Sequence, residues 1–245
     1  STEAMPTLPG DSASASPSAS ASTKKPTVGT NLDAIKVSGK FGQAPRVTVS
    51  KAPWQINKTQ SKDLSTGKGR VVSGDDAVVV NYHGVNGRTG KVFDSSFVRG
   101  DTAFFPLNGV VAGFKKGLDG HRVGSRVLMA MTGKDGYDAM GGSGDGSIAV
   151  GDTLIFVVDI VDASLPEATG TAKAAPKGMP SVTFKKGSPV VTIPKSDPPT
   201  KNKVAYLITG KGKKIKSTDQ VALHYQWVSW KTGKVIEDSY GQIEV

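Results

Sequence analysis

The sequence contains no cysteine, so disulfide bonds, thiolate metal sites and cysteine nucleophiles are excluded. The redox compartment stays open, because exported proteins without cysteine are common. Histidine occurs three times, at His83, His121 and His224, and none has the spacing to carboxylates that metal sites show. No apolar run approaches the ~20 residues of a membrane-spanning helix. We therefore expect neither a metal site nor a membrane-spanning helix.

Arginine is missing from the last third of the chain. Residues 164–245 carry 13 lysines and 6 acidic side chains, a net charge of +7 (13 − 6). Proteins that bind nucleic acid usually add arginine for bidentate contacts and aromatic side chains for stacking. We interpret this segment as a solvated lysine surface and expect no nucleic-acid partner. A weak attraction to an acidic envelope or membrane surface is the alternative.

Large apolar residues are rare in residues 1–30, which are mostly Ser, Ala, Thr and Pro. Such a segment cannot bury enough apolar surface to offset its ordering entropy, so we expect a disordered tether. The chain begins at Ser1 without methionine, and we expect that an upstream signal or lipid anchor was removed or omitted. Ser/Ala/Pro tethers often follow export signals. This predicts an exported protein, extracellular or tethered to the cell envelope.

The sequence predicts several short strands around one short helix. Apolar runs predict strands over three ranges: 77–84, 126–131 and 153–161. The last range is apolar on both faces, as a central strand would be. Between the first two, four apolar residues fall at helical spacing: Val110, Val111, Phe114 and Leu118. Glycines at 117 and 120 limit this helix to roughly two turns. Because one short helix cannot cover a flat sheet, we expect the sheet to curl around it, with the helix as the floor of a pocket.

The C-terminal part of the chain repeats the first part. Tyr82 recurs as Tyr225, and Thr89-Gly90-Lys91-Val92 recurs as Thr232-Gly233-Lys234-Val235, both 143 residues later. The second copy ends before any counterpart of the helix or of the last strand. We therefore predict four segments: a tether (1–30), a domain (31–163), a linker (164–180) and a partial second copy (181–245).

Five motifs in order and spacing resemble the FKBP-type peptidyl-prolyl cis–trans isomerases: Val79-Val80-Asn81-Tyr82-His83-Gly84, Gly90-Lys91-Val92-Phe93-Asp94-Ser95-Ser96, Val110-Val111-Ala112-Gly113-Phe114, Gly124-Ser125-Arg126 and Thr153-Leu154-Ile155-Phe156. The match covers about residues 65–163, with a weaker echo at 204–240. The layout resembles the tandem FKBP proteins of actinobacteria. The resemblance implies an α+β fold, in which an antiparallel sheet of five or six strands curls around one short helix, followed by a truncated second copy.

The resemblance also implies a site. Its catalytic residues would be Phe93, Asp94, Tyr137 and Phe156, and its substrate-binding residues would be Tyr82, Arg99, Val110, Val111, Phe114 and Ile148. The three phenylalanines would form apolar walls around a proline ring, and Asp94, held by Tyr82 and Arg99, would face the rotating carbonyl. The Tyr137 hydroxyl and the Ile148 backbone N–H would donate to ligand carbonyls. Implied partners are proline-containing polypeptides and rapamycin-type macrolides, and the implied rotation of an X–Pro bond requires no cofactor.

The resemblance implies peptidyl-prolyl cis–trans isomerisation, but departures from the family pattern leave a second function open. Phe114 stands where tryptophan is usual, and Ala103 stands where an aromatic wall is usual, although Phe104 or Phe105 could compensate. Ala103 and the non-aromatic second copy favour an FKBP-like module that binds a peptide or partner without useful turnover. The sequence also leaves a Ser/His/Asp triad open, although it has no Gly-x-Ser-x-Gly elbow.

Overall fold

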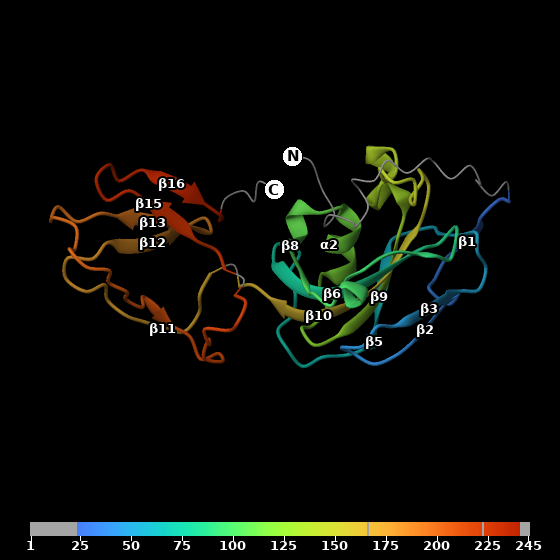
Figure 1. Ribbon diagram of the computed structural model, residues 1–245, viewed down its shortest axis with the longest axis horizontal. Coiled ribbons are helices and arrows are strands. Elements are labelled where there is room, and N and C mark those ends of the chain that lie inside the picture. Colours follow the sequence, from blue (N-terminus) through green and yellow to red (C-terminus); the bar gives the residue numbers. More distant parts are fainter. Residues whose placement is uncertain (1–23, 166, 222, 241–245) are drawn as a thin grey trace. The chain divides into compact units, whose positions relative to one another are not determined.

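The structure is a computed structural model that describes residues 24–165, 167–221 and 223–240 (Figure 1). The chain divides into two compact units between Ser164 and Leu165. Most of the predicted tether lies outside the described residues. Its last part differs from the prediction, because residues 27–29 form a strand. No helix among the described residues is long and apolar enough to cross a membrane.

Unit 1 is built on a six-stranded antiparallel sheet with the strand order β5-β9-β10-β6-β7, and β8 pairs with another part of β6. The strands are β5 (Gln60–Ser65), β6 (Ala77–Asn86), β7 (Val92–Ser95), β8 (Ala103–Pro106), β9 (Arg126–Met131) and β10 (Leu154–Ala163). The helices are α1 (Ser96–Arg99), α2 (Ala112–Leu118) and three 3-10 turns, η1 (Leu107–Gly109), η2 (Gly133–Asp135) and η3 (Asp138–Met140). The predicted α+β fold is confirmed.

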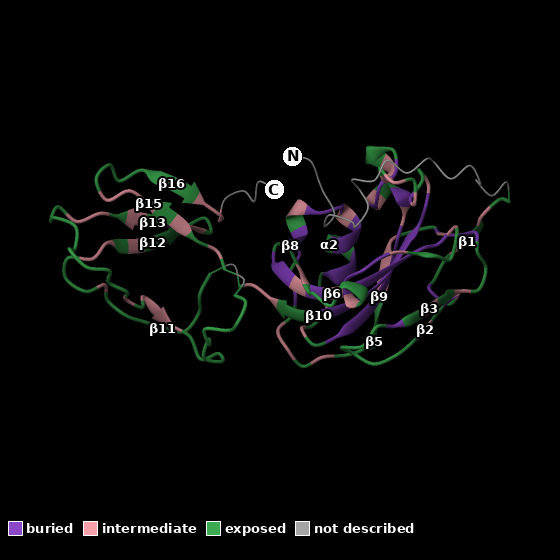
Figure 2. Ribbon diagram, in the orientation of Figure 1, coloured by how far each residue is buried: buried purple, intermediate pink, exposed green. Residues whose placement is uncertain are grey.

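Strand β10 is buried on both faces, as its continuous apolar run predicts. Phe156 and Val158 belong to the cluster that contains Phe114 of α2, whereas Ile155 and Val157 belong to a second cluster. All five side chains are at most 1% exposed. The alternation of side chains along a strand thus gives the sheet one core on each face. Figure 2 shows this burial along β6, β9, β10 and α2.

Residues 27–56, here called the outer layer, cover the second face of the sheet. In this layer β1 (Thr27–Gly29) and β4 (Trp54–Ile56) pair in parallel, and β2 (Ile35–Ser38) and β3 (Arg46–Val49) form a hairpin. The layer and the sheet share the second cluster: Leu32, Ile35, Trp54, Ile56, Val85, Leu128, Ala130, Ile155 and Val157. Ile35/Val37 in β2 and Val47/Val49 in β3 alternate with polar residues, the pattern of a strand with one buried face.

A buried ion pair lies beneath the outer layer. Arg126 of β9 and Asp159 of β10 are 1% and 0% exposed, and their Nε–Oδ1 and Nη2–Oδ2 distances are 2.7 and 2.9 Å. The Gly42 N–H donates to Asp159 Oδ2 at 2.7 Å, and Arg126 Nη2 donates to the Gln43 carbonyl. Buried charges are costly unless they are paired and hydrogen-bonded, so the loop around Gly42 stabilises the Arg126–Asp159 pair.

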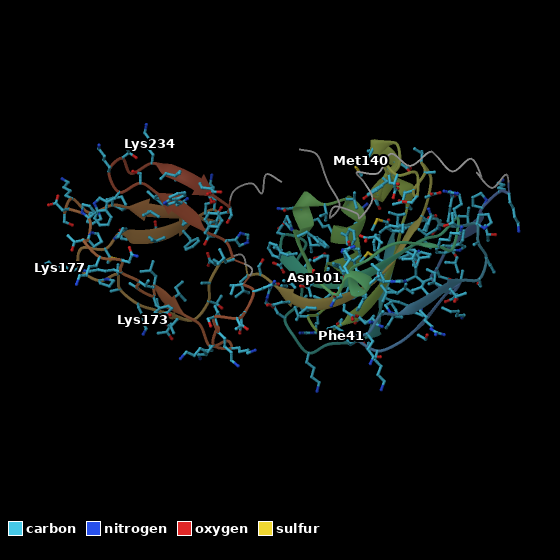
Figure 3. The ribbon with its side chains drawn as sticks, viewed as in Figure 1. Phe41, Asp101, Met140, Lys173, Lys177 and Lys234 are labelled. Carbon is cyan, nitrogen blue, oxygen red and sulfur yellow. The ribbon has the colours of Figure 1, made fainter. Side chains whose placement is uncertain are left out.

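Unit 2 consists of two-stranded ladders. They pair β11 (Thr171–Ala172) with β14 (Ile208–Thr209), β12 (Ser181–Lys185) with β13 (Ser188–Thr192), and β15 (Gln226–Val228) with β16 (Val235–Asp238). The segment predicted as a linker therefore contains β11. Among the described residues of this unit, Pro189 alone is buried. Figure 2 shows this exposure, and Figure 3 labels Lys173, Lys177 and Lys234, three of its exposed lysines.

The hairpin β15–β16 has the register of β6–β7. Gly84 pairs with Asp94, and Trp227 pairs with Glu237, an offset of 143 on both strands (227 − 84 and 237 − 94). A bulge follows these pairs in both hairpins. The turn glycines, Gly90 and Gly233, both have φ of 70°. The offset found in the sequence is therefore also an offset in local backbone structure.

Candidate active site

The aromatic residues expected at the site meet between the sheet and α2. Phe156 of β10 lies at their centre, because its ring centroid is 4.7 Å from that of Phe114, 5.4 Å from that of Phe93 and 6.1 Å from that of Tyr82. Phe114 and Phe156 are at most 1% exposed, and Phe93 is half-buried. The half-buried ring of Phe93 thus connects this aromatic group to solvent.

Glycine allows α2 to lie close against β9. A Cβ at Gly113 would be 2.5 Å from the sulfur of Met131, and a Cβ at Gly117 would be 2.7 Å from the sulfur of Met129. Both distances are too short for carbon–sulfur contact. A Cβ at Gly113 would also be 2.7 Å from Met131 Cβ, so a larger residue there would push the helix, and with it Phe114, away from the sheet. At Gly117 the two closest atoms belong to the flexible end of Met129, which can move aside.

Val110 and Val111 are buried in the same cluster, but they precede the helix. Val110 follows η1 in an extended conformation, and Val111 is the N-cap of α2. The predicted helix that included them was therefore wrong at its start. Val110 and Val111 form a short extended connection between η1 and α2, and this connection buries their side chains as a helix would.

A polar group lies at the edge of the aromatic cluster. The Tyr82 hydroxyl donates to Asp94 Oδ2, and Arg99 Nη1 donates to Asp94 Oδ1. Arg99 Nη2 also donates to the Tyr82 oxygen at 3.0 Å, and the Ser95 N–H donates to Asp94 Oδ1 at 2.9 Å. Asp94 is 5% exposed. Helix α1 is a single turn that ends at Gly100 in the left-handed region, and it brings Arg99 back to the carboxylate.

These contacts set the protonation of Tyr82 and Arg99. Burial, followed by the hydrogen bond to Asp94, raises the pKa of Tyr82 to about 12. Burial opposes the charge of Arg99, but the contacts with Tyr82 and Asp94 outweigh it and raise the pKa of Arg99. Tyr82 therefore stays a neutral donor at neutral pH and Arg99 stays a cation.

Stability at high pH is expected to depend on Tyr82. Because its pKa rises from 10.0 in the unfolded chain to about 12 in the fold, its contribution is complete below pH 10 and is lost between pH 10 and 12. The shift corresponds to at most ~2.7 kcal/mol. The difference in unfolding free energy between the wild type and Tyr82→Phe, measured with urea, should shrink across this interval. A constant difference from pH 8 to 12 would contradict the raised pKa.

The loop between β9 and β10 supplies the last two residues. Tyr137 is 6% exposed and Ile148 2%, and both join the first cluster. The Ile148 N–H donates to Ser143 Oγ at 2.9 Å, and its carbonyl accepts from the Ser143 N–H at 2.8 Å. The predicted role of this N–H as a ligand donor therefore requires that the Ser143 hydroxyl be displaced.

The aromatic wall that is missing at Ala103 is not rebuilt in the same place. Phe104 is 51% exposed, while Phe105 is 4% exposed and packs edge-on against Phe114 at 5.2 Å. Phe105 thus supports the floor of the site from behind. Among the described residues, no group of three or more His, Asp or Glu side chains is placed to hold a metal ion.

Comparisons with known proteins match most of unit 1 to one family. A family model described as "FKBP-type peptidyl-prolyl cis-trans isomerase" matches residues 67–161. A "Probable FK506-binding protein" of Corynebacterium glutamicum is 39% identical over 101 residues, which are 41% of this chain and 83% of that protein. An "FK506-binding protein" of Streptomyces anulatus is 39% identical over 102 residues, 41% of this chain and 82% of that protein.

A longer relative is matched over part of its length. The FKBP-type peptidyl-prolyl cis–trans isomerase FkpA of Escherichia coli is 33% identical over 119 residues, which are 48% of this chain and 43% of that protein. Its crystal structure aligns with a TM-score of 0.39 at 33% identity, over 42% of this chain and 46% of that one. The family match begins after the outer layer and ends before unit 2.

Proposed function

The chain belongs to the family of FKBP-type peptidyl-prolyl cis–trans isomerases and is an enzyme of that class, and we propose that unit 1 rotates X–Pro bonds by removing them from water within the Phe93–Phe114–Phe156 cluster. The observation that carries this proposal is the position of Phe156. It contacts the two other phenylalanines and Tyr82, whose hydroxyl binds the carboxylate at the edge of the cluster.

The chemistry follows from the amide bond. Its rotation barrier is ~18–20 kcal/mol, because resonance makes the planar form rigid and charge-separated. Twisting the bond removes this resonance and lowers the charge on the carbonyl oxygen. An apolar surround therefore disfavours the planar form more than the twisted one and lowers the barrier. This step needs no nucleophile and no cofactor.

The polar group would orient the substrate at the edge of this surround. Tyr82 and Arg99 hold the carboxylate of Asp94, so its charge is compensated and its orientation is fixed. We propose that Asp94 faces the rotating carbonyl and that Tyr137 donates its hydroxyl to a neighbouring carbonyl. The Ile148 N–H would take part only after it leaves Ser143.

A peptide-binding module with little turnover is the second candidate. The smaller floor at Phe114 and the open wall at Ala103 favour it. Rapamycin-type macrolides are proposed ligands under either function, and two relatives carry the name FK506-binding protein. Binding of a macrolide without catalysis would therefore identify the module.

A protease-coupled isomerisation assay tests the proposal. The 245-residue chain and a fragment of residues 24–165 should both accelerate X–Pro exchange, and a saturating rapamycin-type macrolide should abolish the acceleration. The fragment starts before Thr27, because that N–H donates to the Pro53 carbonyl in the outer layer. Saturable macrolide binding with no acceleration in either protein would establish the binding module instead.

We propose that unit 2 is a partial copy of unit 1 without isomerase activity. Ile236 and Glu237 stand where unit 1 has Phe93 and Asp94, and the described residues of the unit form no buried core. Residues 165–245 alone should give no acceleration and no cooperative thermal transition by calorimetry. Turnover above background would contradict the assignment of catalysis to unit 1.

Export and tethering are also proposals. The Ser/Ala/Thr/Pro composition of residues 1–30 supports a tether that leads to an export signal or lipid anchor, and it fits a role in the folding of exported proteins. Fractionation of cells that produce the protein from its own gene would place it in the medium or envelope. Recovery with the cytoplasmic fraction alone would contradict both export and the tether.

A further inference from the structure

Three side chains outside the aromatic cluster form a serine–histidine–aspartate series. The Oγ of Ser61 lies 2.8 Å from Nε2 of His121, and Nδ1 of His121 lies 2.6 Å from Oδ1 of Asp63. Each ring nitrogen thus has one partner, the hydroxyl on one side and the carboxylate on the other. This is the order of contacts in which a histidine serves as general base for a serine and an aspartate orients the histidine.

The backbone fixes all three side chains. Ser61 and Asp63 stand two residues apart on β5, so they project from the same face of the strand. His121 follows α2, where its N–H donates to Leu118 at 3.2 Å and its carbonyl accepts from Val72 at 2.7 Å. The Thr66 hydroxyl donates to Asp63 Oδ2 at 2.9 Å, which leaves Oδ1 for the histidine. The series therefore joins a strand to the turn after α2.

The position of the series lets small molecules reach it. The side chains of His121 and Asp63 are 15% and 29% exposed, and Ser61 is half-buried. Among the described strands, β5 has a single neighbour, β9, so its other edge is open. An edge strand presents N–H groups that can bind a carbonyl oxygen. None of the three residues belongs to the cluster around Phe156.

We propose that Ser61, His121 and Asp63 form a second active site that cleaves small activated carboxylic esters. The Ser61 oxygen bonds to the ester carbonyl carbon while its proton passes to His121 Nε2. The bond from that carbon to the leaving oxygen breaks, and the leaving oxygen takes the proton from His121. Water then attacks the acyl-serine with His121 as base, and this releases the acid and restores the Ser61 hydroxyl. Asp63 holds the imidazole and stabilises its charged form.

Two measurements on the 245-residue chain test this site. A fluorophosphonate probe should label Ser61, located by peptide mass spectrometry, and p-nitrophenyl acetate should be hydrolysed faster than in buffer. Ser61→Ala and His121→Gln should each lower the rate of hydrolysis at least ~10-fold, because a positioned base contributes at least that much. Ser65→Ala, an exposed serine on the same strand, should change neither result.

Thermal unfolding of each variant establishes that it is folded. Absence of label at Ser61 would overturn the proposal, and the three residues would then be a structural hydrogen-bond series. Hydrolysis that falls in His121→Gln but not in Ser61→Ala would also overturn it, because the histidine alone would be the nucleophile. Label and hydrolysis that are both lost in Ser61→Ala would support it.

Discussion

Phe156→Ala is expected to lower kcat/KM for X–Pro isomerisation more than Asp94→Asn does. Phe156 is the ring that contacts Phe93, Phe114 and Tyr82, so its loss opens the apolar surround to water. We expect a loss of roughly 100-fold, the scale that misplacement within a site can cause. Asparagine at position 94 keeps one acceptor oxygen for Tyr82, but it removes the charge and turns an amide nitrogen toward Arg99 and the Ser95 N–H. Because the apolar surround stays intact, a loss below ~10-fold is expected, or ~1.4 kcal/mol.

Controls separate catalysis from folding. Truncation of a buried phenylalanine can cost ~3–5 kcal/mol of stability. Val158→Ala serves as a matched variant, since Val158 lies on the same strand and in the same cluster but outside the aromatic contacts. It should lose stability and keep kcat/KM. If folded Asp94→Asn loses as much activity as folded Phe156→Ala, the polar group dominates instead.

Removal of residues 24–57 is expected to unfold unit 1. The outer layer covers four large apolar side chains of the sheet, Val85, Leu128, Ile155 and Val157, all at most 1% exposed. At ~1.5–3 kcal/mol each, their exposure costs roughly 6–12 kcal/mol. This loss equals most of the free energy of unfolding of a typical domain, ~5–15 kcal/mol. The deletion also removes Gly42 and Gln43 from the buried Arg126–Asp159 pair.

Circular dichroism and size-exclusion chromatography of residues 58–165 would show this loss. The fragment contains the whole family match, residues 67–161, so it tests whether that match is a complete folding unit here. Trp54→Ala in the 245-residue chain is a milder variant, because Trp54 is 1% exposed in the same cluster. Trp54→Ala is expected to lower the free energy of unfolding by ~3–5 kcal/mol. A monomeric fragment with native unfolding free energy would contradict the role of the outer layer.

The sequence predicted the strands that carry an apolar signal. Residues 126–131 were predicted as the strand that β9 forms, and the uninterrupted run in β10 indicated a strand buried on both faces. Strand β5, Gln-Ser-Lys-Asp-Leu-Ser, was missed because an exposed edge strand needs few apolar residues. Strands β1 and β4 are three residues each, too short for any period to be read.

The residues of the candidate site were predicted from motif order, whereas the hydrogen-bond partners of its backbone groups depend on backbone detail. The contacts among Tyr82, Asp94 and Arg99 join residues 17 or fewer positions apart, within one hairpin and its following turn. The hydrogen bond of the Ile148 N–H depends on the conformation of a glycine-rich loop. No residue pattern reports which partner such an N–H selects. The contact between Ser61 and His121 spans 60 residues and needs the fold itself.

Strand β10 is a wall of both cores, with Phe156 on one face and Ile155 on the other. A ligand at 100 times its Kd that binds only folded unit 1 lowers the population of globally opened molecules by ~100-fold, or ~2.7 kcal/mol. Amide hydrogens of β10 that exchange only through global opening must slow by this factor, whichever core their residue faces. The exchange of the β1 amide hydrogens slows by the same factor only if the outer layer opens together with the sheet. Hydrogen exchange with and without ligand therefore measures whether the outer layer and the active site belong to one cooperative unit.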